Sequence, residues 1–429
     1  MEQGDLCRLL SGGVLAPTGG RPAGKPQWAD VQRYVEELRR RSVFPAEPPL
    51  PYEWLDIGPG YCYGPAFGHF DLVHQVLDVA ADQPELARRQ LLNELSLQRG
   101  DGTIPFLWMG ENPARAWLPS GLALAERLRM SGTFPPLWPV GVEACLAVRA
   151  DEELLATAHR ALCRLLAWFD AHRRAPGGGF FYEDIRGGGR WESGMDQSIR
   201  FVDPPAAPAA CVDATSHVYW CRAFAGAWAG RLGQDAGPHQ EAMAGLRRVV
   251  RRDLFCQETG WFHDAWTVAD PARRHLAFEG IWPMVAGAAD ADQAAAALTG
   301  SLLHPGRFDT PHPIATVAPC DDAFELRMWR GCAWNSMTLW AAEACLKYGR
   351  ADGAAELLGK ALDDTAAQFA RTGTVWEFYH PFGGQPEALV RKPGRAIEGP
   401  CRDYLGHNPL SAMARVWAAA TNGAGVSAA

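Results

Sequence analysis

The stretch that decides the fold runs from Trp138 to Arg173 and reads WPVGVEACLAV, RAD, EELLATAHRALCRLLAWFDAHR. Its first part, Trp138–Val148, is apolar on nearly every face, whereas Glu152–Arg173 carries an apolar stripe and a charged face. A helix that is apolar all round is buried, and an amphipathic helix lies half exposed. The stretch therefore predicts a hairpin of one inner and one outer helix.

The same alternation returns near the C-terminus, where the apolar segment Trp329–Tyr348 precedes the amphipathic segment Ala351–Thr372. Strand-like alternation is scarce, and no fixed-period repeat marks a helical array. Two concentric rings of helices explain the pattern, so we expect an all-α chain folded as an (α/α)6 barrel, a six-hairpin toroid with its active site in a bowl of loops at one end. The other helix-length segments are Gln27–Arg41, Asp71–Ala81, Pro84–Gln98, Leu118–Met130, Ala214–Leu232, Gln240–Asp253, Ile281–Gly287, Asp290–Leu302 and Pro409–Ala420.

Two domains are expected. Residues 1–26 are rich in Gly and Pro, and together with the helix Gln27–Arg41 they form an N-terminal arm, residues 1–50. No linker interrupts residues 51–425, which we assign to the barrel and to catalysis.

Composition excludes several classes of function. The chain is 48% hydrophobic and 21% charged with a net charge of -8, so it is globular and offers no electrostatic reason to bind nucleic acid or an anionic membrane. No signal peptide and no apolar run of the ~18 residues of a spanning helix is expected. The 11 cysteines lack metal-ligand spacing, as the histidines do, so we expect free thiols in a reducing cytoplasm, no metal and no cofactor.

The most distinctive loop is Trp191–Phe201, WESGMDQSIRF, which places Glu192 and Asp196 between aromatic residues. Glycines before it, at 187–189, and Asp203-Pro204-Pro205 after it predict a loop. One interpretation is that the two carboxylates cap the following helix. The other is catalytic, because loops on a rigid scaffold commonly carry reactive groups.

The segment WESGMDQS resembles the general-acid loop of the inverting glycosidases that include trehalase, processing α-glucosidase I and the mannosylglycerate hydrolases. The resemblance implies that Asp196 is the general acid. It also implies that Glu377, in VWEFYHPFGG (375–384), is the general base; the alternative is a Glu that bonds amides of its own turn. Inversion needs the two carboxyl groups roughly 6.5 to 9.5 Å apart, so that water fits between sugar and base.

A third segment, MWRGCAW (328–334), is similar to the Trp-Arg-Gly segment of the same family, and the likeness runs from about residue 65 to about residue 420. A small saccharide or glycoside, glucoside- or mannoside-like, is the implied substrate. The residues implied to contact it are Trp191, Glu192, Gln197, Trp329, Arg330, Trp334, Phe67, His69, Asp101, Tyr379 and His380.

The chain departs from the family at its first barrel loop, where Phe67-Gly68-His69-Phe70-Asp71 stands in place of a Trp-Asp pair that holds sugar hydroxyls. His69 and Asp71 are the candidate substitutes. The departure keeps open a second interpretation, a glycosidase-like barrel reused in a biosynthetic pathway or for binding another ligand. A terpenoid-type cyclase is a third, disfavoured because Asp321-Asp322 and Asp363-Asp364 lack the third acid of a DDxxD motif.

Overall fold

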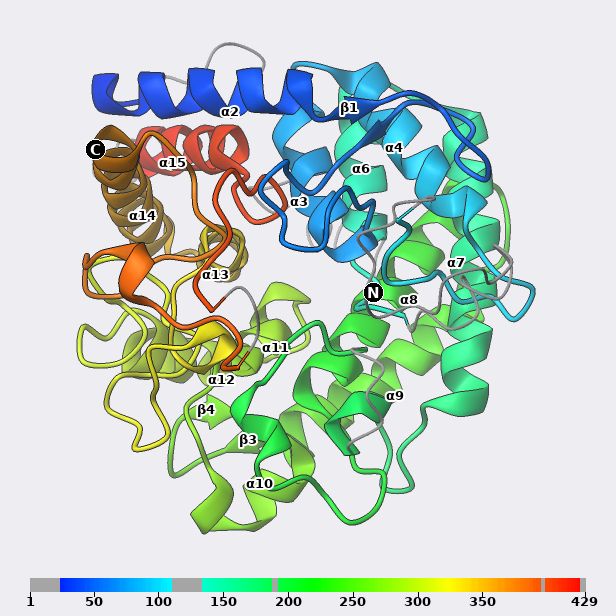
Figure 1. The fold of residues 1–429 in the computed structure, drawn as a ribbon. Helices are drawn as coiled ribbons and strands as arrows, with labels where there is room; N and C mark the ends of the chain where they lie inside the picture. The colour runs from blue at the N-terminus through cyan, green and yellow to red at the C-terminus, as the bar shows by residue number, and fades with distance from the viewer. Residues whose placement is uncertain (1–23, 110–132, 187–191, 395–397, 425–429) are drawn as a thin grey trace.

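The computed structural model describes residues 24–109, 133–186, 192–394 and 398–424. Its helices alternate between two rings, as predicted, and the fold is an (α/α)6 barrel. Figure 1 shows the helices arranged around a ring. The inner helices are α3 (His69–Val79), α6 (Trp138–Val148), α8 (Val212–Arg231), α11 (Trp282–Val285), α13 (Asn335–Lys347) and α15 (Leu410–Ala424). The outer helices are α4 (Pro84–Ser96), α7 (Glu152–His172), α9 (Gly237–Asp253), α12 (Ala291–Ala297), α14 (Ala351–Thr372) and α2 (Ala29–Arg41).

Burial separates the two rings. The inner helix α8 is buried along almost its whole length, whereas the outer helix α9 buries only Met243, Leu246 and Val250. The inner ring closes because α3 packs against both α6 and α15, and α11 packs against both α8 and α13. Two contacts complete the ring: α13 packs against α15, and Trp138 on α6 meets Trp228 on α8 with ring centroids 6.2 Å apart.

Helix α2, predicted as part of an N-terminal arm, packs against α14 and α15 and completes the outer ring (Figure 1). Trp28, just before it, is fully buried and lies edge-on to Trp417 at 4.9 Å. The indole Nε1 of Trp28 also donates to Asp363 of α14 at 2.8 Å. This helix is therefore a structural part of the barrel.

Aromatic side chains from four inner helices fill the barrel axis. Trp340 of α13 donates from Nε1 to Nε2 of His74 on α3 at 3.0 Å. Its ring lies 5.9 Å from Trp220 of α8 and 5.7 Å from Trp282 of α11. Because the axis is packed, a substrate site can form only at an end of the barrel.

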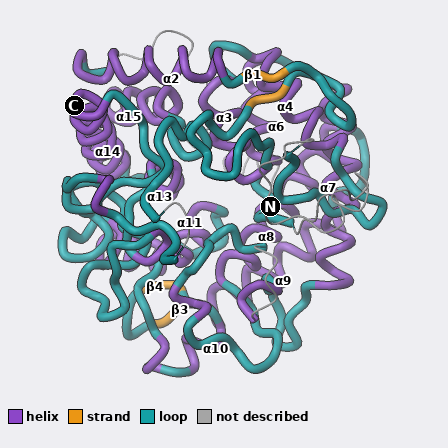
Figure 2. The backbone as a smooth tube through the Cα atoms, viewed as in Figure 1, coloured by secondary structure: helices purple, strands orange, loops and turns teal. Residues whose placement is uncertain are grey.

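The connections from each outer helix to the next inner helix are long, and their described parts cross the middle of the ring in Figure 2. Two short antiparallel hairpins belong to these connections: β1 (Val43–Phe44) with β2 (Trp54–Leu55), and β3 (Phe255–Cys256) with β4 (Trp261–Phe262). The loops also hold a short helix, α10 (Ala265–Ala269). Single helical turns occur at Pro26–Trp28, Glu183–Arg186, Ile199–Phe201, Pro271–Arg273, Phe278–Ile281, Leu298–Leu302, Met328–Arg330 and Pro386–Ala388.

The helix predicted over Trp329–Tyr348 begins only at Asn335. Gly331 adopts a φ of 151°, which breaks the helix and leaves Trp329 and Arg330 on a loop at the site end of the barrel. The predicted helix Leu118–Met130 lies outside the described residues.

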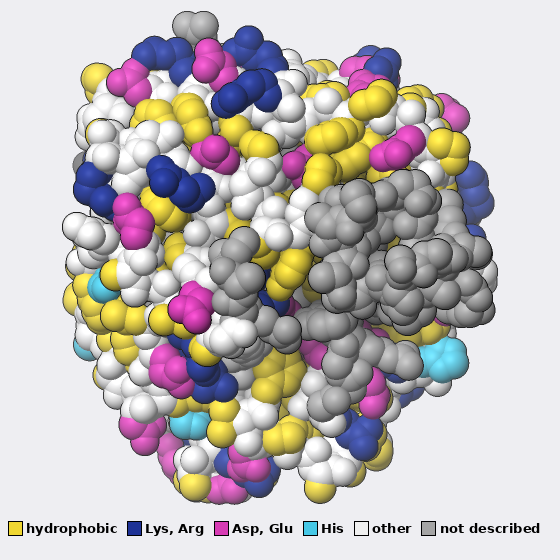
Figure 3. All heavy atoms as spheres, viewed as in Figure 1, with side chains coloured by type: hydrophobic (Ala, Val, Ile, Leu, Met, Phe, Trp, Pro, Cys, Tyr) yellow, Lys and Arg dark blue, Asp and Glu magenta, His cyan; other side chains and the backbone are white. Residues whose placement is uncertain are grey.

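Charges of both signs are interspersed on the face shown in Figure 3. Within the described part of the chain, no helix has the length and apolar character required to cross a membrane.

Candidate active site

Asp196 lies on the loop between α7 and α8, where its carboxylate meets a lysine. Nζ of Lys392 donates to Oδ2 of Asp196 at 2.5 Å, and the two side chains are 15% and 20% exposed, respectively. Burial lowers the pKa of Lys392, but the charge of Asp196, its hydrogen bond and the nearby Tyr63 together raise the pKa above its ordinary value. Asp196 therefore retains contact with solvent while holding a cation.

The loop around Asp196 is fixed by unusual backbone geometry. Gln197 has a φ of 63°, a conformation that few residues other than glycine adopt and that often marks functional sites. The guanidinium Nε of Arg330 donates to the carbonyl of Gln197 at 2.8 Å, and Nη1 donates to Glu325 at 2.8 Å. Arg330 thus holds the loop that presents Asp196.

Glu377 lies on the connection between α14 and α15, and its carboxylate is almost completely buried. Nε of Arg391 donates to its two oxygens at 3.0 and 2.7 Å, and the backbone N–H of Cys401 donates to Oε2 at 3.1 Å. The exposed fractions are 1% for the Glu377 side chain and 4% for that of Arg391. Burial lowers the pKa of Arg391, but the charge and the hydrogen bonds of Glu377, with the nearby Cys401 and Cys62, raise it well above its ordinary value.

The partners of the two carboxylates are consecutive residues, and both cations lie near one aromatic ring. Cζ of Arg391 is 5.6 Å and Nζ of Lys392 is 5.9 Å from the ring centroid of Tyr63. Asp196 and Glu377, far apart in the sequence, therefore reach a common site at the loop end of the barrel. The bowl expected at this end is open to solvent at Asp196, whose side chain is 20% exposed, but not at Glu377, whose side chain is 1% exposed.

Asp71, in the first turn of α3, belongs to the same site. It accepts a hydrogen bond from the hydroxyl of Tyr404 at 2.8 Å, and Nε2 of His407 lies 3.5 Å from the same oxygen. Burial raises the pKa of Asp71 to about 7, and the charge of Glu377 adds to the rise. Asp71 therefore holds a weakly ionised carboxyl beside the proposed base.

Trp329 and Trp334 form a stacked pair behind this carboxyl. Their ring centroids are 3.8 Å apart with an interplanar angle of 3°, and both rings meet His407 edge-on. Both are buried, so the pair builds a rigid wall of the site. Phe67 is also buried and pairs through its backbone with Trp108, which places it in the packed support of the first loop. His69 begins α3, but its side chain lies outside the described part of the structure, as does Trp191.

Four residues predicted to contact the sugar, Glu192, Asp101, Tyr379 and His380, are bonded to other parts of the chain. Both oxygens of Glu192 are bonded, to Arg173 at 2.8 and 2.5 Å and to the amide of Glu183 at 2.8 Å, so this carboxylate fixes its loop. Asp101 is exposed and accepts from the amide and the hydroxyl of Thr103 in a turn that packs on the outer helix α7.

Tyr379 and His380 follow Glu377 but point elsewhere. Tyr379 is buried, stacks on His312 at 4.6 Å and bonds Asn408 through its hydroxyl at 3.2 Å. Nδ1 of His380 accepts from the amide of Phe382 at 3.2 Å in the exposed turn beyond it. The aromatic sequence after Glu377 therefore builds the wall and the turn rather than a surface that faces the carboxylates.

Sequence reasoning missed Arg391 and Lys392, the residues that connect the two acids. The available signal was a pair of adjacent cations in a breaker-rich loop, VRKPG (390–394), between Glu377 and the last inner helix. It also missed Tyr63, because a single aromatic in an irregular loop carries no pattern.

A cavity of about 330 Å³ lies beside this site and shares Arg330 with it. Its floor is the guanidinium of Arg200, which bonds both Asp213 and Asp264 at 2.7 to 2.9 Å. Neither Asp196 nor Glu377 lines the cavity. The cavity is therefore next to the two carboxylates and not between them.

Comparisons with solved structures support the fold. The chain matches the GH63 mannosylglycerate hydrolase of Thermus thermophilus in complex with glucose with a TM-score of 0.67 and 18% identity, covering 92% of this chain and 100% of that one. The complex of the same hydrolase with Tris and D-glycerate matches with a TM-score of 0.67 and 18% identity over 90% of this chain and 99% of that one. Neutral trehalase from Saccharomyces cerevisiae matches with a TM-score of 0.64 and 14% identity over 91% of this chain and 79% of that one.

A comparison with curated protein sequences finds no significant match. The sequence profile of one family does match, over residues 67–395, and it is described as the mannosylglycerate hydrolase MGH1-like glycoside hydrolase domain. This range holds Asp71, Asp196, Glu377 and both cations, and it spans most of the barrel. The chain therefore belongs to the MGH1-like glycoside hydrolase family and is a glycosidase.

Proposed function

We propose that the enzyme cleaves an O-glycosidic bond of a glucoside- or mannoside-like substrate with inversion, with Asp196 as general acid and Glu377 as general base. The observation that carries the proposal is that two consecutive residues, Lys392 and Arg391, each hold one of these carboxylates at a common site. Inverting hydrolysis requires two carboxyl groups on opposite sides of the scissile bond, and two loops of one site can supply them.

In this proposal Asp196 protonates the leaving glycosidic oxygen, while Glu377 takes a proton from the water that attacks the anomeric carbon from the opposite face. The products are the sugar with inverted anomeric configuration and the free alcohol. A base must be ionised, and the cation that contacts Glu377 is Arg391, whose Nε donates to both carboxylate oxygens. Before it can donate a proton, Asp196 must release Lys392 and take up that proton from solvent.

We further propose that the aglycone carries a carboxylate. Such a group can take the place of Asp196 as the partner of Lys392, and binding of the substrate would then free the acid for proton transfer. Support comes from the charge arrangement, and from the D-glycerate bound to the Thermus thermophilus hydrolase of similar fold. A neutral glycoside has no carboxylate that could replace Asp196 as the partner of Lys392.

The test is hydrolysis of a panel of glucosides, mannosides, trehalose and mannosylglycerate. We expect turnover of at least one member, and a decrease of roughly 10²- to 10⁴-fold in Asp196→Asn and in Glu377→Gln, the usual contribution of a general acid or base. Asp203→Asn, an exposed acid later in the same loop, is the matched control and should keep full activity. Unchanged turnover in either catalytic variant would refute the assignment.

Lys392→Met tests the charged aglycone separately. It should reduce kcat/KM for mannosylglycerate more than for a neutral mannoside. Equal losses for both substrates would contradict the carboxylate exchange while leaving the acid and the base in place.

The reused-barrel alternative is favoured by one observation, the 1% exposure of the Glu377 side chain. It predicts no hydrolysis of any panel member, together with binding of a ligand other than a sugar.

We also propose a reducing, cytoplasmic location, because the ten described cysteines are all free. Thiol labelling of the protein as isolated from cells should modify its accessible cysteines; blocked thiols would contradict this location.

A further inference from the structure

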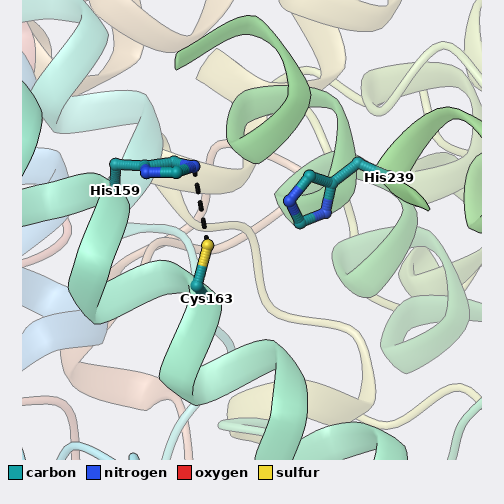
Figure 4. Close-up of side chains that lie close together, drawn as sticks. All are labelled: His159, Cys163 and His239. Atoms are coloured by element: carbon teal, nitrogen blue, oxygen red, sulfur yellow. Dashed lines mark hydrogen bonds between the residues drawn. The ribbon is translucent and has the colours of Figure 1, made fainter. Parts of the chain in front are cut away.

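Three side chains with metal-binding atoms meet on the outer ring, away from the two carboxylates. His159 and Cys163 lie one turn apart on α7, and His239 lies near the start of α9. Their candidate ligand atoms all lie within 4.8 Å of one another. Figure 4 shows the three side chains converging from the two helices.

The pair on α7 already has the spacing of two ligands of one ion. Nε2 of His159 lies 3.5 Å from Sγ of Cys163. With Zn–S of about 2.3 Å and Zn–N of about 2.0 to 2.1 Å, two ligands of a tetrahedral zinc ion lie roughly 3.5 Å apart. Only His239 has to approach, and it is half-buried near a helix end, where a side-chain adjustment suffices.

The hydrogen bond of the other ring nitrogen of His159 also suits metal binding. The imidazole makes a hydrogen bond to the backbone of Ala225 on α8, which leaves Nε2 to face Cys163. A backbone carbonyl on one ring nitrogen with the metal on the other is the usual arrangement of a metal-binding histidine.

On His239, Nδ1 lies 3.4 Å from Nη1 of Arg222, which leaves Nε2 as the candidate ligand atom. Because a guanidinium only donates, Nδ1 is the acceptor in this contact and the neutral ring carries its proton on Nε2. Metal binding at Nε2 moves that proton to Nδ1, so Arg222 must withdraw from this contact. Arg222 is already paired with Asp170, and that carboxylate together with a Cys163 thiolate offsets the added positive charge.

We propose that His159, Cys163 and His239 bind a zinc-like divalent cation that fastens α7 to α9, with water at the fourth position. Binding converts the thiol of Cys163 to a thiolate and releases its proton to solvent. Two imidazoles and one thiolate suit zinc rather than the oxygen-seeking magnesium or calcium. Cys163 and His239 are each partly exposed, so an ion can reach them.

A second metal-like group in the described residues, Cys211, Asp213 and Asp264, lacks this capacity. The carboxylates of Asp213 and Asp264 are bonded to Arg200, and burial raises the pKa of Cys211 well above its ordinary value. In a third group of the described residues, His275, Asp321 and Asp322, Nδ1 of His275 is bonded to Asp321 at 2.8 Å. In the group on α7 and α9, by contrast, Nε2 of His159 and Sγ of Cys163 already face each other.

The test uses the full chain, treated with a chelator, reduced and titrated with Co²⁺ alone. We expect one Co²⁺ per chain, a thiolate-to-cobalt charge-transfer band, the visible bands of a tetrahedral ion, and loss of all of them when Zn²⁺ is added. Zn²⁺ should also raise the Tm of the chelator-treated protein. Absence of the charge-transfer band in the wild-type chain would overturn the proposal.

Variants identify the ligands. Cys163→Ser should abolish the charge-transfer band, and His239→Gln should weaken Zn²⁺ binding by at least about tenfold, since even the outer partners of metal ligands contribute that much. The matched controls are Cys320→Ser and His304→Gln, at exposed positions, which should bind as the wild-type chain does.

Equal binding by Cys163→Ser and Cys320→Ser would overturn the assignment. Far-UV circular dichroism checks that each variant folds. If Cys163→Ser does not fold, His239→Gln tests the site, because His239 is only half-buried. Unchanged Zn²⁺ affinity in that variant refutes the site.

Discussion

The two adjacent cations should differ strongly in what they contribute to stability. Arg391 and Glu377 form a pair whose side chains are 4% and 1% exposed, whereas Lys392 and Asp196 are 15% and 20% exposed. Arg391→Met removes the cation and leaves Glu377 with the hydrogen bond from the backbone amide of Cys401. Leaving a buried charge unpaired costs about 3 to 5 kcal/mol.

Lys392→Met is the matched control at the neighbouring position. Pairs that solvent reaches contribute about 0 to 1 kcal/mol, so this variant should unfold close to the wild-type midpoint. The double variant Arg391→Met with Glu377→Gln removes both buried charges and should recover most of the lost stability, since replacing a whole buried pair is often neutral.

Urea unfolding followed by tryptophan fluorescence measures all four proteins, and the double-variant cycle isolates the coupling between the two residues. A loss below about 1 kcal/mol in Arg391→Met would refute the buried pair as we describe it, given the cost stated above. A double variant no more stable than Arg391→Met would also refute it.

Three further outcomes follow from the site. Glu192→Ala should lower the free energy of unfolding by about 3 to 5 kcal/mol, because it leaves the buried Arg173 unpaired, and KM should change little; a raised KM at unchanged stability would instead support the sugar contact. Gly331→Ala should cost about 1 to 3 kcal/mol and reduce kcat, because at a φ of 151° its Cβ would lie 2.5 Å from the carbonyl of Glu325; activity and urea midpoint equal to wild type would contradict this. Burial raises the pKa of Asp71 to about 7, above its unfolded value near ~4, so its share of stability is full below pH ~4 and is lost as pH rises to about 7. Asp71→Asn should flatten that part of the dependence of Tm on pH, and an unchanged slope would contradict the shift.

Much of the fold could be predicted because buried helices are apolar on all faces and half-exposed helices are amphipathic. Trp138–Val148 and Ala351–Thr372 were expected as helices and have those bounds in the structure. The start of α13 could not be predicted from burial, because the mostly apolar sequence begins before the helix does. Trp329 and Arg330 lie in a separate turn of the preceding connection. Only the backbone at Gly331 reveals the break.

Site residues could be predicted only where they stand in a recognisable sequence segment. Asp196 and Glu377 stand in recognisable segments, and the structure brings them to a common site, but their catalytic roles stay predictions. Arg391 and Lys392 could not be assigned, because an ion pair between distant loops depends on tertiary packing that no local pattern encodes. Glu192 was predicted to contact the sugar because it lies near Asp196 in the sequence. In the structure its carboxylate pairs with Arg173 instead.

The anomer released first from the substrate tests the central claim most directly. Proton NMR of a fresh reaction, recorded before the sugar mutarotates, distinguishes the two anomers. We predict release of the anomer opposite to that of the substrate, because water attacks from the Glu377 side while Asp196 protonates the leaving oxygen. Release of the same anomer as in the substrate would contradict the paired acid and base, and with them the proposed mechanism.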